Sequence, residues 1–142
     1  DLAEMEKTML AFEQSRDVSN GVERSEANLL FHLAISRAAH NRHFAGFYDS
    51  ALLGTIRLAR ACFAQASTVE YLNPTTEEDL AAHLAETERQ HRAIFAAIAA
   101  QDVDLADRLA VDHYVLTRDR VEKVLFRVDP VVAGLDLSVK PR

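Results

Sequence analysis

Three histidines of this 142-residue sequence occupy positions where a helical pattern would place apolar side chains. At about 100° per residue, His32 shares one helix face with Ile35 and Ala39, and Asn28 precedes it by one turn on that face. The other two histidines are each central in the apolar stripe of a later helix: His91 among Leu80, Leu84, Phe95 and Ile98, and His113 among Ala106, Leu109 and Leu116. Three predicted helices therefore each direct one imidazole inward.

Inward imidazoles need hydrogen-bond partners or a metal ion, because an unsatisfied polar group in a core costs about 1–3 kcal/mol. Imidazole is a good ligand for Zn, Ni, Cu and Fe, and helical bundles build metal sites from facing helices. Three histidines and the amide oxygen of Asn28 would leave one or two positions open to water or an anion. Two other interpretations stay open. The imidazoles could simply hydrogen-bond one another in a metal-free interaction bundle, or the open position could activate water in a metal-dependent enzyme, for which Glu88 is the base to consider.

The remaining histidines and two arginines have weaker patterns. His40 and His43 flank a predicted helix junction and His83 lies at the edge of a polar face, so all three are predicted at the surface. Arg57 and Arg60 lie beside an apolar stripe, where their stems would pack and their charged ends would reach water. Either one could instead bind a carboxylate through a bidentate contact.

The elements that must position these residues are helices. Only four Gly and three Pro occur in the chain, too few for the frequent turns of a sheet protein. Apolar periodicity, capping patterns and turn residues predict an all-α, antiparallel bundle of about five to seven helices, the clearest over residues 2–16, 23–39, 42–66, 75–100 and 102–127. Pro130 ends the last of them, and residues 129–142 are predicted to be a tail.

Composition excludes several functions. With 16 basic and 22 acidic residues, the net charge of −6 disfavours binding to a phosphate backbone. No apolar run approaches the roughly 20 residues of a membrane span, and no signal segment opens the chain. The single cysteine, Cys62, allows no internal disulfide and suits a cytoplasmic protein. No nucleophile elbow, phosphate loop or H-E-x-x-H motif is present, so we do not expect an enzyme.

Two segments resemble the signatures of a known family. Residues 28–41, N-L-L-F-H-L-A-I-S-R-A-A-H-N, are similar to the D/N-x-x-F-H-x-x-I/L-x-x-A-x-x-N signature of the FCD domain. That domain is the C-terminal effector-binding and dimerisation half of FadR-type GntR transcription regulators. The run from His91 through Asp102 and Ala106 to His113 is similar to the second signature of the family. The resemblance covers about residues 1–127.

The resemblance implies a ligand-sensing domain that spans residues 1–128. The four metal-ligand positions of the family fall on Asn28, His32, His91 and His113, and the ion implied is Zn or Ni, to which a small carboxylate effector can bind. Asn28 stands where many members have Asp, so the site has a weaker ligand and one negative charge fewer. The family also implies a homodimer whose DNA contacts come only from an N-terminal winged helix-turn-helix domain. We expect that domain to be absent from this chain, which begins at Asp1.

Overall fold

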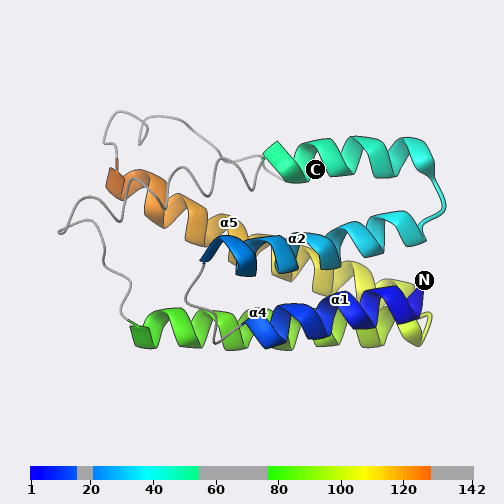
Figure 1. Cartoon of the computed structure of the whole chain (residues 1–142), viewed down its shortest axis with the longest axis horizontal. Coiled ribbons are helices and arrows are strands. Elements are labelled where there is room, and N and C mark those ends of the chain that lie inside the picture. The colour runs from blue at the N-terminus through cyan, green and yellow to red at the C-terminus, as the bar shows by residue number, and fades with distance from the viewer. Residues whose placement is uncertain (16–20, 55–76, 129–142) are drawn as a thin grey trace.

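The computed structural model describes residues 1–15, 21–54 and 77–128, and nearly all of these residues are helical (Figure 1). The named helices are α1 (Leu2–Gln14), α2 (Gly21–Ala38), α4 (Glu77–Ala99) and α5 (Val103–Val128). Residues 42–54 are helical as well, and the described ranges contain no strand. Helices consecutive in the chain run in opposite directions (Figure 1). The prediction of an all-α antiparallel bundle is confirmed.

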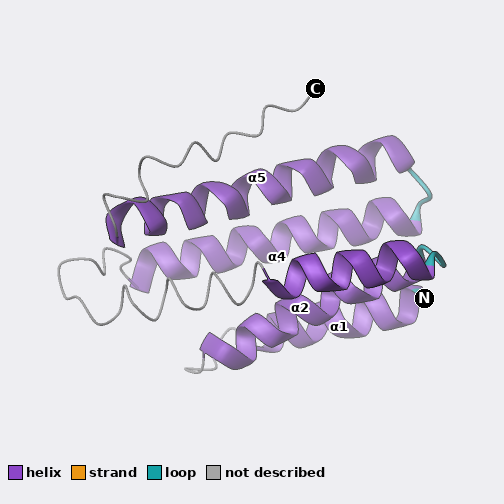
Figure 2. Ribbon diagram, turned by 90° about the horizontal axis from the view of Figure 1, so that it is seen from above, coloured by secondary structure: helices purple, strands orange, loops and turns teal. Residues whose placement is uncertain are grey.

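The four named helices form two antiparallel pairs. Helix α1 packs against α2, α4 packs against α5, and α1 also contacts α4, so the two pairs lie beside each other (Figure 2). The predicted helix bounds agree with the observed ones to within two or three residues wherever both can be compared. The predicted end of the third helix, the first two residues of the helix predicted over 75–100, and the tail at 129–142 lie outside the described residues.

Helix α1 buries the apolar face that its sequence predicts. Met5, Met9 and Phe12 recur at steps of four and three residues, and each is at most 4% exposed. The hydroxyl groups of two buried polar residues donate to carbonyl groups of the same helix, Thr8 to Glu4 and Met5, and Ser15 to Phe12. Burial of α1 therefore leaves these hydroxyl groups satisfied.

Two residues form the turn after α2: His40 reverses the chain at the end of that helix, and Asn41 begins the next helical segment. His40 has φ 52°, a left-handed conformation that reverses the chain, and its N–H donates to the carbonyl of Arg37. Asn41 then caps the helical residues 42–54, because its Oδ1 accepts the N–H groups of His43 and Phe44 at 3.2 and 3.1 Å.

The α4–α5 corner fixes the register of two histidines. Gln101 has φ 58°, and the N–H groups of Gln101 and Asp102 donate to the carbonyl groups of Ile98 and Ala97, which is the Schellman arrangement. Asp102 also begins α5, since its Oδ1 accepts the N–H of Leu105 at 3.0 Å. His91 lies ten residues before this corner and His113 twelve after it, so the antiparallel hairpin brings them to similar heights.

The buried face of α4 is turned relative to the predicted stripe. Leu84 and His91 are buried as expected, but Phe95 and Ile98 are only half-buried, and Ile94 and Ala97 are buried instead. The reason is that α4 packs against both α1 and α5, so polar residues such as Thr87 and Gln90 also belong to its buried face. On α2, Ala39 is exposed and the prediction that it faces the core is wrong, because the helix ends at Ala38.

Within the described ranges, none of the helices combines the length and the apolar character that crossing a bilayer requires.

Candidate metal centre

Three imidazoles from three helices meet in the interior of the bundle. His32 comes from α2, His91 from α4 and His113 from α5, and one ring nitrogen of each lies within 4.8 Å of those of the others. The ring centroids are 5.2 Å apart for His32 and His91, 5.1 Å for His32 and His113, and 4.8 Å for His91 and His113. The three residues that the helical pattern turned inward are thus in mutual contact.

His91 is the most deeply buried member of this histidine cluster. Its exposed fraction is 0%, and its ring lies 5.0 Å from the ring of Phe12 and 4.5 Å from that of Phe31. Neither Nδ1 nor Nε2 of His91 has a hydrogen-bond partner among the described residues. Because buried polar atoms are nearly always paired in folded proteins, a fully buried imidazole with two unpaired nitrogens points to a ligand that accepts its lone pair.

His113 is held by hydrogen bonds at both ring nitrogens. Its Nδ1 lies 2.8 Å from Oε1 of Gln90, and its Nε2 lies 3.3 Å from Nε2 of His32. The 3.3 Å separation is about that of two nitrogens in one tetrahedral zinc shell with Zn–N bonds of about 2.0–2.1 Å. Hydrogen bonding joins only one of the three imidazole pairs, so the cluster does not satisfy itself as a metal-free core would.

Asn28 supplies an oxygen atom of the kind predicted. The residue is half-buried, its Oδ1 is buried, and that oxygen has no hydrogen-bond partner in the part of the chain that the structure describes. Asn28 lies one turn before His32 on α2, so both side chains project from the same face of the helix. An unpaired amide oxygen on the face that carries His32 fits the fourth ligand position of the predicted site.

Burial keeps the three histidines neutral. Desolvation, with a smaller contribution from the neighbouring charge of His113, lowers the pKa of His32 from 6.5 to about 3. Desolvation likewise lowers the pKa of His91 to about 2, with added repulsion from His32 and His113, and it lowers the pKa of His113. A neutral imidazole keeps the lone pair that a metal ligand needs. The donor set therefore fits a divalent ion at neutral pH without losing a proton.

The other residues singled out by the sequence lie away from this cluster or outside the described residues. His40 and His43 are exposed and His83 is half-buried, and none of the three belongs to the cluster. His40 pairs with Asp1 at 2.8 Å. Arg57 and Arg60, the predicted carboxylate contacts, lie outside the described residues. In the part of the chain that the structure describes, no carboxylate joins the histidine cluster, and Glu88 is not among its members.

A buried residue that sequence reasoning missed is Gln90. It is 8% exposed, and its side chain bonds to His113. Gln90 lies about 100° around α4 from His91, outside the stripe drawn through apolar residues alone. A signal was nevertheless present, because a polar residue next to an inward histidine can reach an imidazole on the neighbouring helix.

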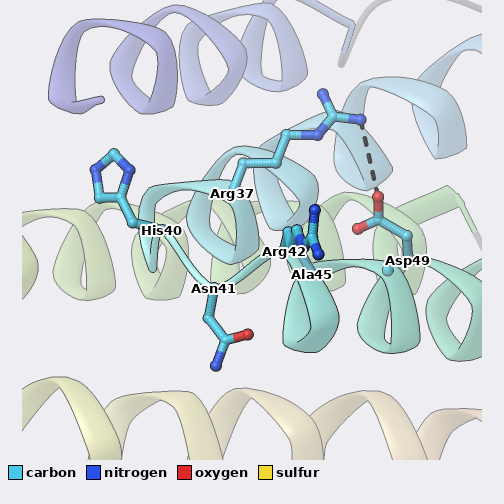
Figure 3. A pocket seen from close by; sticks show the side chains of 7 residues that line it. Arg37, His40, Asn41, Arg42, Ala45 and Asp49 are labelled. Atoms are coloured by element: carbon cyan, nitrogen blue, oxygen red, sulfur yellow. Dashed lines mark ion pairs between the residues drawn. The ribbon is translucent and has the colours of Figure 1, made fainter.

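A hollow of about 460 Å³ lies elsewhere, between the end of α2 and residues 42–54 (Figure 3). Its lining includes Arg37, Arg42 and Asp49, and the guanidinium group of Arg37 points to Asp49 at 3.9 Å. None of the three clustered histidines lines this hollow, which opens widely to solvent. His91 of the histidine cluster carries two buried ring nitrogens without a hydrogen-bond partner among the described residues, so that cluster is the candidate functional site.

Comparison with known proteins agrees with the residue patterns. The family model of the FCD domain matches residues 1–116. No curated protein and no solved structure matches the chain. The matched range contains all four residues of the candidate site.

Proposed function

The chain belongs to the FCD domain family, the effector-binding domains of GntR-family regulators, and from this premise we propose that it senses a small organic acid at a divalent metal ion. The proposed protein ligands are His32, His91, His113 and Asn28. Membership of the family makes a ligand-sensing role in a regulator the function to test first. The observation that carries the metal proposal is the environment of His91, which is fully buried with both ring nitrogens unpaired beside two other imidazoles.

The donor set favours zinc or nickel. Three neutral imidazole nitrogens and one amide oxygen suit borderline metals such as Zn and Ni, whereas Mg and Ca prefer shells of oxygen atoms. All four protein donors are uncharged, so the site would keep the full double positive charge of a bound ion. When bound, that ion supplies an electrophilic centre to which a carboxylate can coordinate.

The charge of the site defines the effector class. An Asp in place of Asn28 would cancel part of the charge of the ion, and its absence leaves more attraction for an anion. The surrounding wall is apolar, with Phe12 and Phe31 against His91, so electrostatic attraction there is screened less than in water. A small carboxylate satisfies both features, since it supplies the missing negative charge and one or two oxygen ligands. We assign Arg57 and Arg60 to its remaining oxygens.

The position of the site suggests how binding is transmitted. His32, His91 and His113 lie on three different helices, so an effector held there acts on α2, α4 and α5 together. An effector can shift the bundle between two arrangements only by the difference in its affinity for them. We propose that this shift passes through a homodimer to N-terminal winged helix-turn-helix domains that bind DNA in the cytoplasm. Residues 1–128 would form the sensing domain and residues 129–142 a tail.

A thermal-shift screen of the metal-free domain tests this proposal. We expect one equivalent of Zn²⁺ or Ni²⁺ to raise the melting temperature and a matching carboxylate to raise it further only when the metal is present. An effector at 100 times its dissociation constant should add about 2.7 kcal/mol to the free energy of unfolding. Failure to retain metal, together with unchanged melting, would favour a metal-free interaction bundle. Turnover of an ester or amide that requires His91 would favour an enzyme instead.

A further inference from the structure

Gln90 links the histidine cluster to charged residues on the outer part of α4. Its Oε1 lies 2.8 Å from Nδ1 of His113, and its Nε2 donates to Oε1 of Glu86 at 3.1 Å. We propose that Gln90 is a positioning residue that holds the proton of His113 on Nδ1 and so directs the bare Nε2 lone pair into the cluster. The use of that lone pair for a metal rests on the proposed function, whereas the proton position does not.

Glu86 determines which way the amide of Gln90 faces. An ionised carboxylate only accepts hydrogen bonds, so the group of Gln90 that faces Glu86 must be the NH₂ group. The carbonyl oxygen of Gln90 is then the group that faces His113. The opposite orientation would place two acceptors against each other at Glu86. The Glu86 carboxylate thus settles which end of the Gln90 amide is the oxygen and which is the nitrogen.

Arg89 keeps Glu86 ionised and in place. Its guanidinium group donates to both carboxylate oxygens of Glu86, at 2.8 and 2.6 Å. This hydrogen bonding is the main cause that lowers the pKa of Glu86. The Glu86–Arg89 contact spans three residues and the Glu86–Gln90 contact four residues of the same helix, the two spacings at which side chains on one helix face meet. Side chains of α4 therefore orient the amide group of Gln90, which contacts Nδ1 of His113 on α5.

The orientation of Gln90 fixes the tautomer of His113. An oxygen acceptor at Nδ1 requires the proton there, because a neutral imidazole has one N–H and one bare nitrogen. The Nε2 of His113 is then an acceptor, and the 3.3 Å contact requires His32 to donate from its own Nε2. Histidines that bind metals nearly always donate their second N–H to a carbonyl or carboxylate group, and Gln90 supplies such an oxygen in advance.

The proton position can be read directly from imidazole ¹⁵N shifts. We expect the metal-free protein, labelled with ¹⁵N-histidine at neutral pH, to show His113 protonated on Nδ1 and His32 protonated on Nε2. In Gln90→Met, which keeps the length of the side chain but has no amide oxygen, His113 should populate both tautomers. Gln90→Glu alone would set two carboxylates against each other, so it is combined with Glu86→Gln. This double variant restores an oxygen acceptor at His113 and a donor–acceptor pair between positions 86 and 90, and it should return the proton to Nδ1. Circular dichroism will show whether each variant is folded.

Zinc affinity gives the second readout. Loss of a residue that orients a ligand typically lowers metal affinity about 10–100-fold. We expect a loss of this size for Gln90→Met and recovery for the double variant Gln90→Glu with Glu86→Gln. Thr87→Val is the matched control, since Thr87 is also buried on α4 but its hydroxyl group donates to the carbonyl of His83. It should bind zinc as the wild type does.

The two proposals fail in different ways. Protonation of His113 on Nε2 in the wild type, or identical tautomer populations in the wild type and Gln90→Met, would overturn the role of Gln90. If the wild type binds no zinc or nickel but its His113 shows the expected tautomer and Gln90→Met loses it, the proposed function fails and the positioning role of Gln90 stands.

Discussion

At the scale of single residues, His91 combines full burial with two unpaired ring nitrogens. A side chain placed only for stability would not leave two polar atoms unsatisfied among the rings of Phe12 and Phe31, because each such atom weakens the fold. Buried polar atoms without hydrogen bonds are typical of binding sites, where the bound ligand supplies the missing interaction. The environment of His91 therefore indicates a binding role more clearly than the environments of His32 and His113 do.

Replacing His91 by Leu should separate stability from metal binding. The apolar side chain has a similar volume and removes two desolvated nitrogens, so we expect the metal-free variant to be as stable as the wild type or up to about 1–3 kcal/mol more stable. Zinc uptake should be lost. Urea denaturation and metal analysis measure the two effects. His83→Leu, on the same helix but outside the cluster, should bind zinc normally; equal zinc losses from both variants would refute the assignment of His91.

Asn28→Asp tests the oxygen ligand. A carboxylate binds divalent zinc more strongly than an amide oxygen, so we expect zinc affinity to rise by roughly tenfold, or about 1.4 kcal/mol. The added negative charge should at the same time weaken the binding of a carboxylate effector. Calorimetric titration with zinc, and then with the effector identified by thermal shift, measures both changes. Unaltered zinc affinity in both Asn28→Asp and Asn28→Ala would exclude Asn28 as a ligand.

The candidate site was predictable from the sequence only in part. The apolar period shows that His32, His91 and His113 each face inward, because that pattern depends on residues of a single helix. The contact between Gln90 and His113 was not predictable, since it depends on how far α5 is rotated and shifted against α4. The half-buried positions of Phe95 and Ile98 have the same cause, because α4 has neighbours on two sides.

At the scale of elements, the α4–α5 corner sets the heights of His91 and His113. The last helix is predicted to begin at residue 102, and the structure has a turn at Gln101 followed by Asp102 as the N-cap of α5. These features were predictable because they use local chemistry, a turn followed by an acidic N-cap. The left-handed conformation of Gln101 was not, since Gly or Asn usually occupies such positions. The register of the hairpin thus depends on few residues.

Asp102→Ala should weaken this corner. Loss of the N-cap bond to the N–H of Leu105 leaves a helix-terminal donor without its partner, and we expect the free energy of unfolding to fall by about 1 kcal/mol. Asp107→Ala is the control, because Asp107 is exposed within the same helix and should change stability by less than about 0.5 kcal/mol. Urea denaturation of the metal-free variants measures both. Equal losses would show that Asp102 acts through its charge rather than as a cap.

At the scale of the whole molecule, the buried histidines make stability depend on pH. The pKa of His32 is lowered to about 3 and that of His91 to about 2, both mainly by desolvation, from the value of 6.5 expected in the unfolded chain. Between these values the unfolded state binds more protons than the folded state, so acid favours unfolding. Each histidine contributes a slope of up to about 1.4 kcal/mol per pH unit, and the stability present above pH 6.5 is lost as the pH falls toward 3.

Denaturation in urea at several pH values checks this dependence. We expect the free energy of unfolding of the metal-free protein to be level near pH 7.5 and to fall steeply below about pH 6. His91→Leu should reduce the steepness by the contribution of one proton. Stability that does not change between pH 7.5 and pH 5 would contradict the burial of neutral imidazoles.

The net charge of −6 bears on which partners this chain can bind. A chain with six more acidic than basic residues is a poor partner for DNA, and the histidine cluster is the part of it suited to an anion. In the proposed function, this chain binds the carboxylate effector, and a separate domain binds the operator DNA. In that function, a ring nitrogen of His91 and the amide oxygen of Asn28, which have no hydrogen-bond partner among the described residues, bind the metal ion.

The most direct test is the X-ray absorption spectrum of the domain loaded with one equivalent of zinc. We predict a shell with three imidazole nitrogens at about 2.0–2.1 Å and one or two oxygen atoms, with loss of the bound zinc in His91→Leu. A shell of oxygen atoms without imidazole, or a protein that retains no zinc after gel filtration, would contradict the proposed metal centre.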